Sequence, residues 1–352
     1  MDAPRSFSLE VREGTIMENT FSFDDILILP HFKSEVKSRS LVNTTSHLYS
    51  TELKIPAISA SMSAFDTVSP ESRDISWQFA SQMSEAGGMH IFSRSTLFDQ
   101  RYEAAKTLGS TQHNVGIAVS LDEFEVYRSK LEELPAIVSI DIANGSILQN
   151  VVWQGQYPLV VGNYGNPRVL GRADLRGNLI YKFGIGGGSS CSTRLETGVG
   201  APQGWLIYHA SMKSDRYSDG HKPIISDGGV KSTADFVKAI AFGAEAVMMG
   251  YVFAGARETP WEPIKIDGKW YKPYRGMASS QEKQASSHVE GVSGYVPYED
   301  KSIKTIMFEL RDGLTSAMSY SDATDIPSFM ENVEFVLAPS SQNENQTRLV
   351  HA

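Results

Sequence analysis

Eight short apolar runs, separated by stretches long enough for a helix, constrain the fold of this 352-residue chain more than any other feature. The runs are rich in β-branched residues and show no strict alternation of apolar and polar positions, as expected of strands buried on both faces. In chain order they cover residues 56–60, 88–92, 115–119, 137–141, 159–163, 179–183, 223–227 and 246–250. Eight strands with helices between them predict a closed (β/α)8 barrel. A doubly wound open sheet is the alternative, because strand order is not visible in a sequence.

Local signals agree with this alternation. Residues 121–134 and 233–242 have the apolar spacing of helices. Ser232 and Asp235 can form a capping box at the start of the second helix, and Gly243 can end it. Asp267 and Gly268 indicate the turn of a hairpin after the last predicted strand.

Composition excludes several classes of protein. The net charge is −9 and no long Lys/Arg run occurs, which argues against a nucleic-acid partner. The single cysteine cannot form an intrachain disulfide and fits a reducing compartment. No apolar signal core or membrane-length span is present, so we expect a cytoplasmic protein with no membrane partner. The eight histidines show no metal-ligand spacing, so no metal site is predicted.

The expected organisation is one catalytic domain. Residues 1–20 form an N-terminal extension, 21–339 the barrel with an active-site flap around 275–300, and 340–352 a polar tail. The gap between Phe92 and Val115 is too short for an inserted domain, so no regulatory domain is predicted there.

A glycine-rich stretch, residues 184–193, follows the sixth predicted strand and contains the only cysteine, Cys191. Glycines allow backbone amides to approach a ligand closely, and a thiolate is a strong nucleophile. Hydroxyl side chains flank the thiol at Ser190, Ser192 and Thr193, which favours a reactive cysteine. The alternative is a tight turn followed by a buried cysteine that only fills space.

Other strand ends also carry polar or glycine residues, and in a barrel the carboxyl ends of all strands meet on one face. Asp227, Gly228 and Gly229 end the seventh run and could bind sugar hydroxyls and a phosphate. Gly250 ends the eighth run, and loops after these two strands often build a phosphate site. Residues 141–145 could hold a cofactor ribose, or form an ordinary turn closed by an Asx side chain.

These segments resemble one family. Residues 184–203 (GIGGGSSCSTRLETGVGAPQ), together with 224–229 (IISDGG) and 274–277 (YRGM), are similar to the IMP dehydrogenase/GMP reductase family. Residues 23–30, 37–40 and 141–145 extend the resemblance over nearly the whole chain. It implies a (β/α)8 barrel, usually tetrameric, in which the loop cysteine bonds to C2 of a purine.

The reductase branch is the better match. Arg194 follows Thr193 where dehydrogenases usually carry glutamine, and residues 197–200 read like the reductase loop. Residues 277–290 are short and lack the Arg-Tyr pair that activates water in dehydrogenases. Residues 290–298, however, read more like a dehydrogenase.

The resemblance implies roles for particular residues. Cys191 is similar to the nucleophile, and Thr193 and Glu299 to the pair that assists loss of ammonia. Asp227 resembles the ribose ligand and Asp141 a cofactor contact. The remaining predicted contacts are to substrate at Ser189, Gly228, Gly229, Gly250, Tyr251, Gly276 and Met277, and to cofactor at Asn144 and Gly145.

The implied reaction converts GMP and NADPH to IMP, ammonia and NADP, with a purine nucleoside monophosphate as ligand and a homotetramer as assembly. Four positions depart from the family pattern: Gly187 replaces a proline, Tyr251 lies near the expected phosphate, Val296 replaces an arginine, and Ala278 replaces a serine. The alternatives are an IMP dehydrogenase without its regulatory domain, a variant acting on a deoxy or modified purine nucleotide, and a binding protein without turnover.

Overall fold

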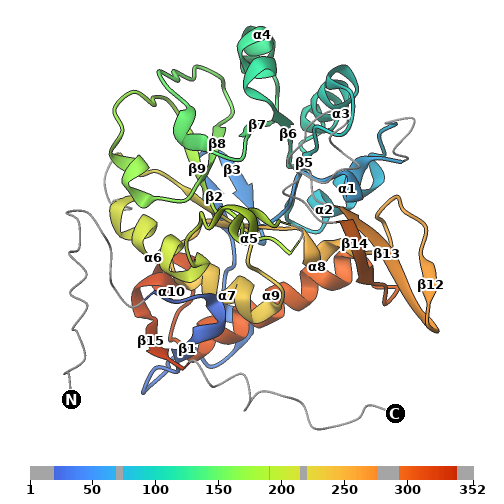
Figure 1. Ribbon diagram of the computed structural model, residues 1–352. Helices are drawn as coiled ribbons and strands as arrows, with labels where there is room; N and C mark the ends of the chain where they lie inside the picture. Colours follow the sequence, from blue (N-terminus) through green and yellow to red (C-terminus); the bar gives the residue numbers. More distant parts are fainter. Residues whose placement is uncertain (1–19, 69–73, 190, 215–219, 276–292, 339–352) are drawn as a thin grey trace, which may run out of the picture.

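The computed structural model describes residues 20–68, 74–189, 191–214, 220–275 and 293–338. Its centre is a closed barrel of eight parallel strands (Figure 1), in the order β10-β11-β4-β5-β6-β7-β8-β9. The strands are β4 (Ala57–Ser59), β5 (Met89–Phe92), β6 (Val115–Val119), β7 (Ile137–Asp141), β8 (Leu159–Tyr164), β9 (Leu179–Phe183), β10 (Ile224–Asp227) and β11 (Ala246–Met249). Each of the eight apolar runs forms one strand. The predicted barrel is confirmed and the open doubly wound sheet is wrong.

Helices surround the barrel. The longer ones are α2 (Gln78–Glu85), α3 (Phe98–Ser110), α4 (Leu121–Glu132), α6 (Gln203–Ser214), α7 (Thr233–Ala241), α9 (Ile303–Tyr320) and α10 (Ile326–Asn332). Short helices are α1 (Ser63–Asp66), α5 (Thr193–Thr197) and α8 (Tyr251–Ala254). The 3₁₀ turns are Phe23–Asp25, Arg39–Leu41, Gly145–Ile147 and Pro167–Gly171. Between β5 and β6 the chain forms only α3 and its connections, so the absence of an inserted domain there is confirmed.

Helix α7 illustrates how sequence fixes these elements. Ser232 Oγ accepts a hydrogen bond from the backbone N–H of Asp235 (3.2 Å), and Asp235 Oδ2 accepts one from the N–H of Ser232 (3.1 Å). This is the predicted capping box. Phe236 and Ile240, four residues apart, are both fully buried against the barrel.

The interior of the barrel changes from apolar to polar along its axis. The part away from the carboxyl ends of the strands is filled by apolar side chains that point inward, such as Ile58, Ile91 and Ile225. A hairpin of β2 (Ser46–Leu48) and β3 (Thr51–Leu53) adds Leu48 and Leu53 to this cluster. At the carboxyl ends the inward positions become charged or polar, which leaves room for a site there.

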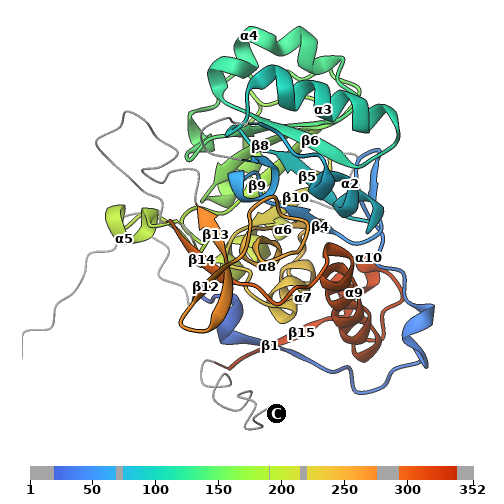
Figure 2. The ribbon, with the colours of Figure 1, turned by 90° about the vertical axis from the view of Figure 1, so that its right-hand side faces the viewer.

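A three-stranded antiparallel sheet follows the barrel: β12 (Ile264–Ile266), β13 (Lys269–Arg275) and β14 (Ser293–Pro297). Asp267 and Gly268 have φ of +47° and +81° in the turn between β12 and β13, which confirms the predicted hairpin. Figure 2 shows this sheet on the same side of the barrel as α5. Strands β1 (Ile26–Leu29) and β15 (Glu334–Leu337) pair separately.

Lys272 on β13 connects this sheet to the loop after α8 through hydrogen bonds. Its side chain is only 2% exposed, and Nζ donates to the carbonyl oxygens of Ala256, Arg257 and Thr259 and to Thr259 Oγ1 at 2.8–3.1 Å. The same face of β14 presents Val296, which is buried opposite Lys272. The departure from the family arginine at this position therefore lies in the core.

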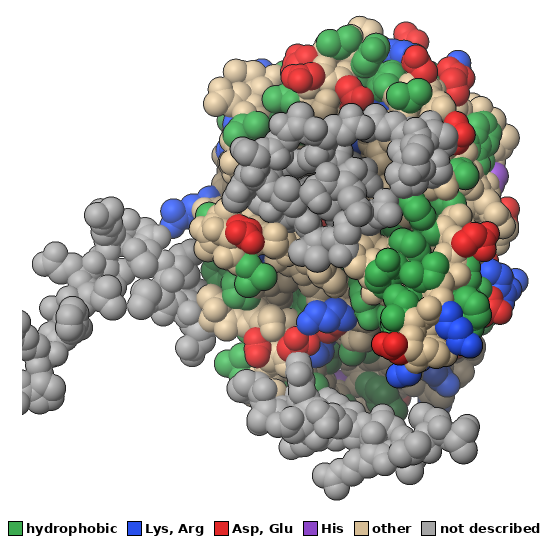
Figure 3. Space-filling view, turned by 45° about the vertical axis from the view of Figure 1, so that its right-hand side comes forward, with side chains coloured by type: hydrophobic (Ala, Val, Ile, Leu, Met, Phe, Trp, Pro, Cys, Tyr) green, Lys and Arg blue, Asp and Glu red, His purple; other side chains and the backbone are tan. Residues whose placement is uncertain are grey.

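The surface mixes charges. On the face seen in Figure 3, acidic and basic side chains are scattered among polar and apolar atoms. Within the described ranges, no helix has both the length and the apolar character needed to cross a membrane. Nor do the described residues include a group of three or more His, Cys, Asp or Glu side chains placed to hold a metal ion.

Candidate active site

A cavity of about 310 Å³ lies at the carboxyl ends of the barrel strands. That volume is at the lower end of the range for small-molecule sites. Its walls come from the loops after most of the strands. The lining residues are Ala60, Ser61, Met62, Arg94, Asp141, Ile142, Ala143, Asn163, Lys182, Gly184–Ser189, Cys191, Thr193, Asp227–Val230, Met248–Tyr251 and Tyr274.

The cysteine reaches this cavity from the loop between β9 and α5. Cys191 is partly exposed, and its Sγ lies 3.2 Å from Thr193 Oγ1, within hydrogen-bonding distance for sulfur. Thr193 is the first residue of α5, so one short turn carries both groups. A hydroxyl beside a thiol can exchange a proton with it or with a group bound to it.

Arg194 holds this loop in shape. Its Nε donates to the carbonyl of Ile185 (2.8 Å) and its Nη2 to the carbonyl of Ala201 (2.5 Å), which links the chain before the cysteine to the chain after α5. Burial lowers the pKa of the Arg194 guanidinium, and the nearby thiol of Cys191 opposes that shift. The cysteine loop is therefore a preorganised turn with a basic group packed inside it.

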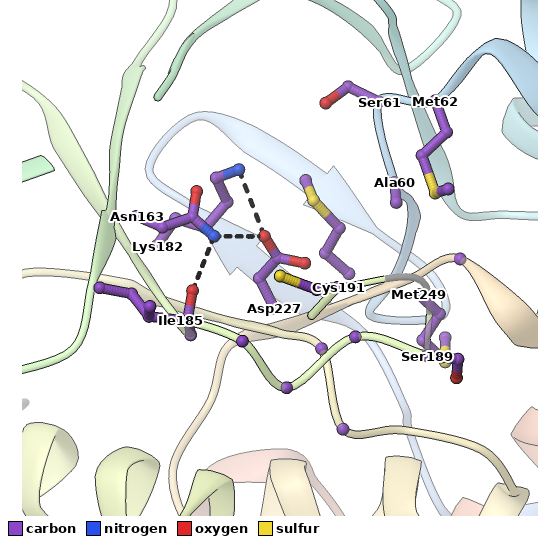
Figure 4. Close-up of a pocket in the computed structure, with 18 of the residues that line it drawn as sticks. Ala60, Ser61, Met62, Asn163, Lys182, Ile185, Ser189, Cys191, Asp227 and Met249 are labelled. Atoms are coloured by element: carbon purple, nitrogen blue, oxygen red, sulfur yellow. Dashed lines mark hydrogen bonds and ion pairs between the residues drawn. The ribbon is translucent and has the colours of Figure 1, made fainter. Parts of the chain in front are cut away.

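Two carboxylates at the strand ends share one ammonium group. Lys182 Nζ lies 2.8 Å from Asp141 Oδ1 and 3.3 Å from Asp227 Oδ2. Asn163 Nδ2 also donates to Asp227 Oδ2 (2.7 Å), and Ser61 Oγ donates to Asp141 Oδ2 (3.2 Å). Figure 4 shows Asn163 and Lys182 pointing toward Asp227. The four strands β7 to β10 therefore meet in one polar network.

The charges in this network favour the ionised forms. Burial alone would raise the pKa of Asp141, but the charges of Lys182 and Arg94 outweigh burial and hold that pKa below its usual value. Burial would likewise lower the pKa of Lys182, but Asp141 and Asp227 outweigh it and raise that pKa. Both ends of the ion pair consequently stay charged at neutral pH.

The glycine turns after β9 and β10 lie against each other. A Cβ at Gly228 would come within 3.0 Å of the backbone N of Gly188 and 3.2 Å of the backbone C of Gly187. Such close approach leaves backbone groups, rather than side chains, at the cavity wall. Tyr251 stands at the edge of the cavity, 37% exposed, with its ring 6.4 Å from that of Tyr274.

Most of the site residues predicted from sequence line this cavity. They are Asp141, Ser189, Cys191, Thr193, Asp227, Gly228, Gly229, Gly250 and Tyr251. Gly276 and Met277 lie outside the described residues.

Three predicted residues do not line it. Asn144 Oδ1 accepts a hydrogen bond from the backbone N–H of Ser146 (3.1 Å), which is the Asx turn of the alternative interpretation. Gly145 is buried against β8, where a Cβ would meet the ring of Tyr164 at 2.9 Å. Glu299 is exposed and forms an ion pair with Lys301 (3.2 Å). The roles of these three toward ligand stay predictions.

Sequence reasoning missed Lys182, Asn163 and Arg94. The signal for Lys182 was present, since a lysine within an apolar strand (LIYKF) must either leave the core or find partners inside it. Asn163 ends the run LVVGN, and Arg94 comes two residues after β5. Both positions are strand ends, where barrel sites are built.

Comparison with known proteins agrees with this geometry. The family model described as "IMP dehydrogenase / GMP reductase domain" matches residues 20–348. The chain belongs to this family. It is similar to the GMP reductase of Bacillus subtilis (strain 168), with 32% identity covering 92% of this chain and 98% of that protein. The GMP reductase of Lactobacillus gasseri is also 32% identical, covering 91% of this chain and 96% of its own length. The chain is thus an oxidoreductase of the GMP reductase type.

Proposed function

We propose that this enzyme converts GMP to IMP and ammonia with NADPH as reductant, through a covalent bond between Cys191 Sγ and C2 of the purine. The observation that carries the proposal is the Cys191–Thr193 pair, 3.2 Å apart at the wall of a cavity built from strand ends. The names of the similar proteins support the choice of GMP as the substrate.

The chemistry divides into two steps. In the first, the Cys191 thiolate forms a bond to C2, the C2–N2 bond breaks, and Thr193 passes a proton to the departing amine so that it leaves as ammonia. In the second, C2 gains a hydride and the C2–Sγ electron pair returns to sulfur as a thiolate. The net change is reduction at C2, with one hydride consumed and one ammonia released.

NADPH supplies that hydride when bound. The cavity fits such a cofactor on one side, because Asp141 presents carboxylate oxygens that can accept hydrogen bonds from ribose hydroxyls. The neighbouring Ile142 and Ala143 add apolar surface to the same wall. In this proposal Asp141 orients the cofactor and Cys191 orients the purine.

Nucleotide binding falls to the loops after β10 and β11. Asp227 Oδ1 accepts no hydrogen bond from the described residues, which leaves it available for a sugar hydroxyl. Gly228, Gly229 and Gly250 bring backbone to the cavity wall, where N–H groups can bind phosphate. Ser189 and Tyr251 add hydroxyls at its edge.

Two further residue roles and an assembly state complete this proposal. Glu299 assists Thr193 in the loss of ammonia, and the backbone of Met277, after Gly276, reads the edge of the purine. The active assembly is a homotetramer, which the native mass in solution will test.

A second candidate is a variant that acts on a deoxynucleotide or a modified purine. Tyr251 is the observation that favours it, since this bulky side chain stands beside Gly250 at the expected phosphate position. IMP dehydrogenation is the third candidate, and it needs a base to activate water.

The test follows nicotinamide absorbance with NADPH and GMP, with dGMP and with IMP plus NAD as parallel substrates. We expect absorbance to fall only with GMP. Cys191→Ala should abolish turnover while GMP still binds, and Thr193→Val should slow it about 10²–10⁴-fold. The matched control is Ser192→Ala, because Ser192 is the buried residue next to Cys191, and this variant should stay active. Turnover by Cys191→Ala would refute the covalent mechanism, and consumption of dGMP alone would select the second candidate.

A further inference from the structure

Lys182 is placed unusually for a lysine. It points into the barrel from β9, its side chain is 1% exposed, and its ammonium group lies within 3.3 Å of both Asp141 and Asp227. The two carboxylates come from β7 and β10, the neighbours of β8 and β9 in the barrel order. A buried charge of this kind is costly unless its partners satisfy it, so the network is either structural or part of the site.

We propose that Lys182 is a positioning residue that sets the separation of Asp141 and Asp227, and so assembles the nucleotide-sugar and cofactor contacts as one unit. The proposal rests on the proposed function for the identity of these two contacts. Lys182 itself touches neither ligand in this account. It acts through the two carboxylates.

The hydrogen bonds support a positioning role over a purely structural one. Lys182 uses one oxygen of each carboxylate, and Asn163 reinforces the same Asp227 oxygen at 2.7 Å. The second oxygen of Asp227 receives no hydrogen bond from the described residues, and Asp227 lines the cavity. A network built only for stability would have no need to orient that second oxygen.

Removal of the Lys182 ammonium group should change the protonation of the two carboxylates, which a simple packing defect would not do. The groups that face this network are Arg94 after β5, Asp141, Asp227 and the neutral Asn163 and Ser61. Without Lys182, burial and the negative charge of Asp227 both raise the pKa of Asp141, and only the positive charge of Arg94 opposes them. The carboxylate pair then takes up a proton as pH falls toward the acid side of neutral.

The sign of the stability effect follows from linkage. A carboxyl group whose pKa is raised in the folded state contributes stability at low pH, and that contribution is lost as pH rises through the raised pKa. In Lys182→Met, the free energy of unfolding should therefore fall, relative to wild type, as pH rises from about 5 to 8. Adding Asp141→Asn should remove this dependence, because the excess charge is gone.

The experiment measures urea unfolding across this pH range for wild type, Lys182→Met, Lys182→Arg and the Lys182→Met/Asp141→Asn double variant. The control is Lys222→Met. Lys222 is a half-buried lysine that precedes β10 at the opposite end of the barrel and donates to the carbonyl of Leu170. We expect pH-dependent loss only in Lys182→Met, with Lys182→Arg close to wild type. If Lys182→Met does not fold at neutral pH, the double variant and the arginine variant still give the comparison.

Steady-state kinetics on the same proteins separate this inference from the proposed function. Lys182→Met should raise KM for GMP and for NADPH together by about tenfold or more, whereas Asp141→Asn should affect mainly NADPH. A pH-independent loss of stability, or unchanged KM for both ligands, overturns the inference. If wild type consumes no NADPH with GMP, the proposed function fails, and the pH series alone decides whether Lys182 holds the two carboxylates.

Discussion

Gly184 is the position where one added methyl group should do most damage to the site. It directly follows β9 with φ of +148°, and a Cβ there would lie 1.8 Å from the carbonyl oxygen of Asp227. Its N–H donates to the carbonyl of Tyr164 (2.9 Å) and its own carbonyl accepts from Asn163 Nδ2 (2.9 Å). The residue is thus held on three sides and cannot move away from the new methyl.

The cost of Gly184→Ala can be worked from these numbers. Relief of the clash needs a separation of at least 3.0 Å, so two neighbouring strand ends must part by more than 1 Å. The backbone conformation costs about 1–3 kcal/mol for a residue with a side chain. Weakening of the two hydrogen bonds adds about 0.5–1.5 kcal/mol each. We expect Gly184→Ala to lower the free energy of unfolding by about 2–6 kcal/mol.

Substitutions at two other glycines separate the cost of the backbone conformation from the cost of the steric clash. Gly198 has φ of +69° with no atom within 4 Å of an added Cβ, so Gly198→Ala should cost only the backbone term, about 1–2 kcal/mol. Gly171 has neither a positive φ nor a neighbour within 4 Å, so Gly171→Ala should change stability by less than about 0.5 kcal/mol. Urea unfolding followed by circular dichroism measures all three.

The turnover assay adds a second readout. Displacement of Asp227 by about 1 Å should reduce turnover by about 10²-fold in Gly184→Ala, while Gly171→Ala stays active. Equal stability of Gly184→Ala and Gly198→Ala would show that the strand ends separate freely. The account of a site held rigid by backbone contact between β9 and β10 would then be wrong.

Two predictions concern buried polar groups away from the cavity. The hydroxyl of Tyr181 is buried with no hydrogen-bond partner among the described residues, and burial raises its pKa to about 12. Tyr181→Phe should therefore raise the free energy of unfolding by about 1 kcal/mol, and a loss of stability would indicate a bound water. Burial lowers the pKa of Lys272 from 10.5 to about 8, so a pH titration of lysine-labelled protein by NMR should show one ammonium group titrating there. Between pH 8 and 10.5 the folded state then binds fewer protons than the unfolded state. The free energy of unfolding of wild type should therefore rise relative to that of Lys272→Met across this pH range. A Lys272 pKa above 10.5 would mean that its four oxygen partners outweigh burial.

The fold followed closely from the sequence because it depends on patterns that are local. All eight apolar runs became barrel strands, since β-branched segments without alternation can satisfy their side chains only when both faces are covered. The capping box at Ser232 and the turn at Asp267 were visible for the same reason, because each needs only residues a few positions apart. Cys191 and Thr193 belong to this group, as one short turn carries them both into the cavity.

The sequence alone did not decide which polar side chains at strand ends line the cavity and which form hydrogen bonds within their own turn. Asp141 and Asn144 lie three residues apart, yet Asp141 faces Lys182 across the barrel while Asn144 closes its own turn. The role of Lys182 depends on β7, β9 and β10 meeting at one level, and their residues are more than 40 positions apart in the chain. Burial of that charge is tolerable only because the closed barrel brings two carboxylates to it, and such an arrangement exists only in the tertiary structure.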